Sequence, residues 1–106
     1  MQLFTDVHGR SIRLTDERSI HLQMAHPEMS NQLPHIAATL AHPDQIVRSR
    51  TDSMVELFYK HYPSTPVISK FLCTVVKVLP ENYFVITAYY TDSPPDTFIT
   101  HFDIDI

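Results

Sequence analysis

The chain has 106 residues, of which 43% are hydrophobic, and it carries a formal net charge of −4. This length and composition allow one domain with a hydrophobic core and exclude wholesale disorder, while the negative balance argues against a broad basic surface for nucleic acid. No apolar run approaches the ~20 residues that a membrane-spanning helix needs, so we expect no membrane association.

The N-terminal part of the chain predicts a short strand, a turn and a helix. Gln2–Phe4 is the predicted edge strand, and the turn surrounds Gly9. A helix over Asp16–Ala25 follows, because Thr15 is a good N-cap and Pro27 disfavours helical geometry in the residue before it. The apolar stripe of this helix consists of Ile20, Met24 and, close to it, Leu22.

A second predicted helix has one continuous apolar face. Ser30 or Asn31 can cap it, and Pro34 is tolerated in its first turn. Pro43 and Asp44 end it. Its apolar residues recur at positions i, i+3, i+4 and i+7, namely Leu33, Ile36, Ala37 and Leu40.

From residue 45 onwards the apolar period changes to two, which predicts strands. The predicted strands are Gln45–Arg50, Met54–Tyr62, Val67–Leu79 and Tyr83–Tyr90. Residues 93–96 are predicted to form a loop, and Thr97–Ile106 a weak edge strand. Helices first and hairpin-linked strands afterwards predict an α+β fold, in which two N-terminal helices pack on one face of a roughly four-stranded antiparallel sheet.

Alternation sorts the side chains of the last strand onto two faces. The more apolar set, which we assign to the helix-covered core, is Phe84, Ile86, Ala88 and Tyr90; the opposite set is Tyr83, Val85, Thr87 and Tyr89. Charged side chains are rarely buried alone, so Lys77, Arg48 and Arg50 are also assigned to the open face. These cations and hydroxyls form either a site for phosphate chemistry or an ordinary solvated face with a cross-strand aromatic pair.

Histidines and the lone cysteine are the other candidates for chemistry. His21 and His26 flank the end of the first predicted helix and suit general acid–base catalysis, with packed or surface histidines as the alternative. Glu28 is placed to orient an imidazole or to stabilise the start of the second helix. The spacing matches no standard zinc motif, so no metal or other cofactor is predicted. Cys73 excludes an internal disulfide; it is expected to pack as a small hydrophobe, and its lone thiol and the absence of a signal-peptide pattern favour the cytoplasm.

Taken as an ordered set, several segments resemble a known family. They begin with Arg13–Arg18, His21 and His26–Met29 and continue through Thr39–Leu40, Pro43–Arg50, Tyr59–Lys60, Leu72–Val78 and Val85–Asp92. This set spans about residues 12 to 92 and looks like a phage-type barnase–EndoU–colicin–RelE-like (BECR) nuclease domain. The resemblance implies two helices followed by a four-stranded antiparallel sheet, the order that the periodicity also predicts.

The resemblance implies a metal-independent endoribonuclease of the toxin or phage-derived type, which cleaves RNA by attack of the 2′-hydroxyl. The implied catalytic residues are His21, His26, Lys77, Thr87 and Tyr89, and the substrate-binding residues are Arg48 and Arg50. A histidine would move the proton, while Lys77 and an arginine would offset the charge on the phosphorane. The expected partners are an RNA substrate and a cognate antitoxin or inhibitor protein. The alternative is a catalytically inactive module of the same fold that binds a protein partner.

Overall fold

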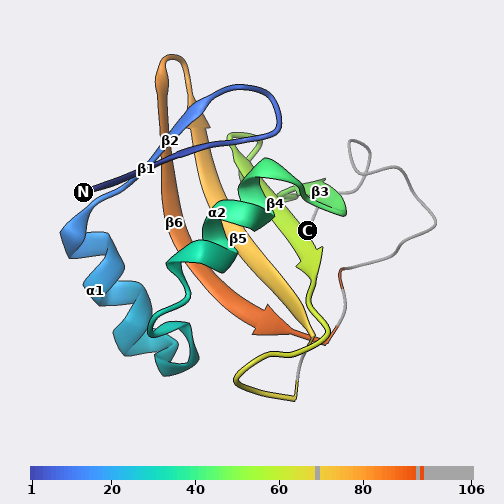
Figure 1. Cartoon of the computed structure of the whole chain (residues 1–106). Coiled ribbons are helices and arrows are strands. Elements are labelled where there is room, and N and C mark those ends of the chain that lie inside the picture. Colours follow the sequence, from blue (N-terminus) through green and yellow to red (C-terminus); the bar gives the residue numbers. More distant parts are fainter. Residues whose placement is uncertain (69, 93, 95–106) are drawn as a thin grey trace.

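The computed structural model describes residues 1–68, 70–92 and 94 of the chain (Figure 1). In this part, two α-helices and a short 3-10 helix accompany a six-stranded sheet. The elements are β1 (Gln2–Thr5), β2 (Ser11–Leu14), α1 (Asp16–Ala25), η1 (Pro27–Met29), α2 (Leu33–Ala41), β3 (Gln45–Arg48), β4 (Val55–His61), β5 (Phe71–Leu79) and β6 (Asn82–Thr91). Both α-helices lie on the same face of the sheet, so the predicted α+β class is confirmed.

The sheet is larger than predicted and is not purely antiparallel. Its described strands follow the order β1-β2-β6-β5-β4-β3. β2 was not predicted, and it runs parallel to β6, where Ile12 pairs with Tyr83 and Arg13 with Phe84. The expectation of four antiparallel strands was therefore wrong. A hairpin of β1 and β2 extends the sheet beyond β6, and its parallel contact joins residues that lie far apart in the chain.

Helix α1 has the predicted bounds but not the predicted buried stripe. The Thr15 side chain accepts a hydrogen bond from the Arg18 backbone N–H, and the helix ends before Pro27. Leu22 is its buried residue, whereas Ile20 and Met24 are 60% and 75% exposed. Leu22 stands two positions from each of them, about 200° around the helix, so burying Leu22 turns both outwards.

Helix α2 begins differently from the prediction. Its N-cap is Gln32, which forms no side-chain capping bond, and the predicted cap Asn31 instead adopts a left-handed backbone conformation with φ of 63°. Pro34 does lie in the first turn. The predicted apolar face is confirmed, since Ile36 and Leu40 are fully buried against the sheet.

A β-bulge changes the faces assigned to β6. Val75 pairs with Thr87 but Val76 pairs with Val85, which leaves Ile86 as an extra residue. Before the bulge the alternation is therefore reversed relative to the prediction. Tyr83 and Val85 contact the helix-covered core, while Ile86 belongs to the cluster on the other face. The assignments of Ala88 and Tyr90 to the core, and of Tyr89 to the other face, are confirmed.

Apolar side chains form two clusters, one on each face of the sheet. The helix-covered cluster includes Ile12, Leu14, Leu22, Ile36, Leu40, Phe58, Leu72, Val76, Val85, Ala88 and Tyr90. The second cluster consists of Val47, Val55, Leu57, Tyr59 and Cys73, with Val75, Ile86 and Tyr89 packed against it. The open face predicted for phosphate chemistry is thus largely apolar in its centre.

Other strand limits also differ from the prediction. β3 ends at Arg48 rather than Arg50, and β5 begins at Phe71 rather than Val67. The predicted edge strand Thr97–Ile106 lies outside the described residues, as do residues 93, 95 and 96 of the predicted loop. None of the described helices has the length and apolar character needed to cross a membrane.

Candidate active site

A polar cluster lies where β6 ends and where the chain passes from α1 through η1 into α2. We call it the histidine–tyrosine cluster and define it as His26, Glu28, Gln32, His35, Tyr62, Tyr89 and Tyr90. Its members come from three parts of the sequence, which α1, α2 and the sheet bring together. The contacts fall into two groups, His26 with Glu28 and Tyr89, and His35 with Gln32, Tyr62 and Tyr90, which meet at the consecutive residues Tyr89 and Tyr90.

His26 is held between a carboxylate and an aromatic ring. Its Nδ1 atom lies 3.8 Å from Glu28 Oε2, too far for a hydrogen bond but close enough for a direct charge interaction. Its ring centroid lies 5.4 Å from that of Tyr89. The side chains of His26 and Glu28 are 34% and 21% exposed. The histidine therefore has a fixed orientation and still reaches solvent, and the predicted role of Glu28 in orienting an imidazole agrees with this contact.

His35 is oriented by a chain of hydrogen bonds. The Tyr90 hydroxyl donates to Gln32 Oε1 at 2.7 Å, and its oxygen lies 3.0 Å from His35 Nδ1. A phenol has one proton to donate, so His35 Nδ1–H must be the donor to Tyr90. The other ring nitrogen, Nε2, forms no hydrogen bond with a described residue. In neutral His35, Nε2 is consequently the atom that can accept a proton.

Tyr62 fixes the ring of His35 from the other side. The two rings stack at 4.3 Å between centroids, and the Tyr62 hydroxyl donates to the His35 carbonyl oxygen at 2.9 Å. The Thr39 hydroxyl donates to the same carbonyl at 2.8 Å. Burial raises the pKa of Tyr62, and burial raises the pKa of Tyr90 to about 12. Both tyrosines are therefore neutral hydrogen-bonding groups at physiological pH.

Tyr89 connects the cluster to the second face of the sheet. It pairs with Cys73 across β5 and β6, and Cys73 in turn pairs with Tyr59 across β4 and β5. Burial raises the pKa of Cys73 to about 11 and also raises the pKa of Tyr89. A thiol in this state is a poor nucleophile at neutral pH. Cys73 is fully buried, as its interpretation as a small hydrophobe predicts.

The structure brings only some of the predicted site residues together. His26 and Tyr89 are in contact, and Thr87 lies two positions from Tyr89 on the same face. Lys77 stands four residues along β5 from the partner of Tyr89, about 13 Å away. Lys77 is also ion-paired with Asp52. Lys77 therefore shares a face of the sheet with Tyr89, as predicted, but lies outside the histidine–tyrosine cluster.

His21, Arg48 and Arg50 also lie outside the cluster. His21 is 64% exposed, and its nearest carboxylate is Glu17 at 4.0 Å. Arg48 alternates with Val47, whose side chain belongs to the second cluster, so Arg48 projects from the helix-covered side of the sheet and not from the face predicted for it. Arg50 is exposed beyond the end of β3.

Sequence reasoning missed His35, Gln32 and Tyr90 as members of a site. Tyr90 and His35 lie 55 positions apart, so no local spacing links them. A signal was nevertheless present in α2, where Gln32 and His35 stand three positions apart on the side that approaches the sheet. Polar residues at such positions need a partner in the sheet, and a tyrosine assigned to the core supplies one.

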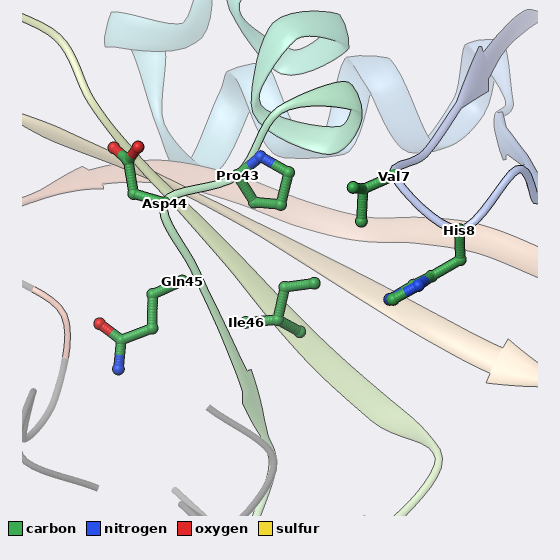
Figure 2. A pocket seen from close by; sticks show the side chains of 6 residues that line it. All are labelled: Val7, His8, Pro43, Asp44, Gln45 and Ile46. Atoms are coloured by element: carbon green, nitrogen blue, oxygen red, sulfur yellow. The ribbon is translucent and has the colours of Figure 1, made fainter. Parts of the chain in front are cut away.

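A different cavity lies between the β1–β2 turn and the start of β3 (Figure 2). It measures about 210 Å³ and is lined by Val7, His8, Pro43, Asp44, Gln45 and Ile46. Val7, Pro43 and Ile46 form its apolar wall, and His8 and Asp44 stand at opposite ends (Figure 2). The Asp44 carboxylate already has a hydrogen-bond partner, because it accepts the His61 backbone N–H at 2.7 Å. The cavity therefore lacks converging polar groups for catalysis.

The described residues contain no group of three His, Cys, Asp or Glu side chains that could hold a metal ion. Comparison with family models, with curated proteins and with solved structures found no match for this chain. The resemblance to BECR nucleases therefore stays a prediction from the sequence. The function has to be argued from the histidine–tyrosine cluster itself.

Proposed function

We propose that the protein is a metal-independent endoribonuclease that uses His26 and His35 for proton transfer. The observation that carries this proposal is that two imidazoles contact consecutive residues near the end of β6, His26 beside Tyr89 and His35 beside Tyr90. His35 Nδ1 is hydrogen-bonded to the Tyr90 hydroxyl, and His26 Nδ1 lies 3.8 Å from the Glu28 carboxylate. Two histidines can supply the base and the acid that cleavage by a 2′-hydroxyl requires.

The chemistry divides between the two imidazoles according to their partners. Neutral His35 accepts the 2′-hydroxyl proton at Nε2, and O2′ attacks the adjacent phosphorus. Protonated His26 donates its proton to O5′ as the P–O5′ bond breaks. The products are a 2′,3′-cyclic phosphate and a 5′-hydroxyl. Glu28 offsets the positive charge of protonated His26, and neutral Tyr90 accepts from His35 Nδ1–H throughout the reaction.

Tyr89 and Thr87 remain part of the proposal in a supporting role. Tyr89 packs against the His26 ring and limits its rotation, so it is a positioning residue. Thr87 offers a hydroxyl on the same face of β6 as Tyr89. Lys77 takes no part, because it is ion-paired with Asp52 and lies about 13 Å along the sheet from the partner of Tyr89.

Purified full-length protein incubated with single-stranded RNA tests this proposal. We expect cleavage that persists in chelator and leaves cyclic phosphate ends. His26→Ala and His35→Ala should each lower the rate about 100-fold or more, since general acid–base catalysis contributes about 10² to 10⁴. The matched control is His8→Ala, which removes an exposed histidine far from the cluster. Absence of cleavage, loss of cleavage in chelator, or equal rates in all three variants would reject the proposal.

A second candidate function is a catalytically inactive module that binds a protein partner such as an antitoxin or inhibitor. The specific observation for it is an apolar strip on α1, where Ile20 and Met24 stand one turn apart and are 60% and 75% exposed. Growth of bacteria that express each variant separates the two functions. Growth arrest abolished by His35→Ala supports the nuclease. Arrest that survives His35→Ala but is lost in Ile20→Glu/Met24→Glu supports the interaction module.

A further inference from the structure

A groove lies at the other end of α1, where β2 leaves β6. We call it the arginine groove and define it as Arg13, Thr15, Arg18, Phe84 and Val85, which line a cavity of about 220 Å³. The pairing of β2 with β6 stops after Arg13 and Phe84, and Thr15 then starts the helix. The groove is thus built where the strands separate.

Three cationic residues lie in the region of Phe84, namely Arg13, Lys77 and Arg18. Phe84 pairs with Arg13 on one side and with Lys77 on the other, so the three side chains share one face of the sheet. Arg13 donates to the Asn82 side-chain oxygen, and Lys77 is paired with Asp52. Arg18 reaches the same cavity from α1 and forms no ion pair with a described residue. Arg18 is therefore the cation that is free to bind an anion.

The groove continues past Arg13 into an adjoining cavity of about 280 Å³, lined by Leu3, Ser11, Arg13, Glu81, Asn82 and Tyr83. Local positive charge stands out in a chain with a net charge of −4. Two carboxylates are close in sequence, Asp16 and Glu17, but their side chains are 86% and 88% exposed and are screened by solvent.

We infer that the arginine groove binds a nucleotide of single-stranded RNA, with a phosphate on Arg13 and Arg18 and a base against Phe84. Guanidinium groups bind phosphate through paired donors, and an aromatic wall favours a nucleotide over a free phosphate because bases stack on it. The choice of RNA as the ligand rests on the proposed function. The same helix passes from Arg18, beside Phe84, to His26, beside Tyr89. The eight helical steps from Arg18 to His26 span about 12 Å, which a few nucleotides of extended strand can bridge.

Binding of a 2′-O-methyl oligoribonucleotide, which cannot be cleaved by 2′-hydroxyl attack, tests the groove by fluorescence anisotropy at two salt concentrations. Arg18→Gln should weaken binding about 5- to 10-fold and reduce the salt slope by about one. Phe84→Leu should weaken binding about fivefold or more without changing the salt slope. Lys60→Gln is the control, because Lys60 lies on β4, outside the groove, and its ammonium group donates to the His42 carbonyl oxygen.

Three outcomes would overturn the inference. They are equal losses in Arg18→Gln and Lys60→Gln, affinity that Phe84→Leu leaves unchanged, and inorganic polyphosphate that competes as well as the oligonucleotide. The failure of the two proposals can be told apart. If wild type and Arg18→Gln cleave unmodified RNA equally fast, the groove proposal is rejected and the nuclease proposal stands. If the oligonucleotide binds through the groove but unmodified RNA is not cleaved, the nuclease proposal is rejected and the groove proposal stands.

Discussion

The two ends of β6 are built in opposite ways. At the histidine–tyrosine cluster His35 is held by hydrogen bonds through Tyr90 to Gln32, and His26 lies beside Glu28 and Tyr89. At the arginine groove the cavity is open, and Arg18 has no described partner. Catalytic groups need to be held in place before the substrate arrives, whereas a phosphate-binding group can be ordered by the phosphate itself. We therefore assign catalysis to the histidine–tyrosine cluster and RNA binding to the arginine groove.

Kinetic separation of the two ends is the strongest test of this comparison. His35→Ala should lower kcat about 100-fold or more with little change in KM, because it removes a group that acts in the transition state. Arg18→Gln should instead raise KM several-fold and leave kcat nearly unchanged. Steady-state rates on one RNA substrate measure both. A fall in kcat of equal size in the two variants would show that the ends do not divide the work.

Alkaline pH should lower the free energy of unfolding through the buried tyrosines of the histidine–tyrosine cluster. The pKa of Tyr90 is about 12 in the folded protein against an ordinary value of 10, so its neutral form is favoured by folding. The stability that this shift supplies is complete below pH 10 and is lost as the pH rises through 12. At about 1.4 kcal/mol per pKa unit the full shift corresponds to about 3 kcal/mol, and solvent screening lowers the expected loss to about 1–2 kcal/mol. Urea unfolding between pH 9 and pH 12 measures it, and Tyr90→Phe should flatten the curve.

Tyr90→Phe should have a smaller effect at neutral pH. It removes the acceptor of His35 Nδ1–H and the donor to Gln32 Oε1. Since the ring is retained, we expect a loss of about 1–2 kcal/mol in the free energy of unfolding. Chemical denaturation checks this, with Tyr83→Phe as the matched control on the same strand. A neutral result would mean that solvent readily replaces the Tyr90 hydroxyl, and that His35 is not held as described.

Local signals account for what the sequence predicted correctly. The bounds of α1 followed from the Thr15 cap and from Pro27, and the last strand followed from its alternation. The contact of His26 with Glu28 joins residues two positions apart, so it too could be anticipated.

Long-range contacts account for most of what was missed. Arg13 meets Phe84 only because β2 lies parallel to β6, and Lys77 meets Asp52 across a turn and a strand. No periodicity in a single segment encodes such pairs. The bulge in β6 had the same effect on a smaller scale, because Ile86 reversed the faces of the residues before it.

The bulge also determines where β6 can vary in length. Because Ile86 has no partner of its own in β5, a chain lacking it would still direct Val85 towards the helices and Thr87 away from them. Loss of another residue from the middle of this strand would instead turn the residues between the deletion and position 86 to the opposite face. Position 86 is therefore the point at which β6 can lose one residue while every other side chain of the strand keeps its present face.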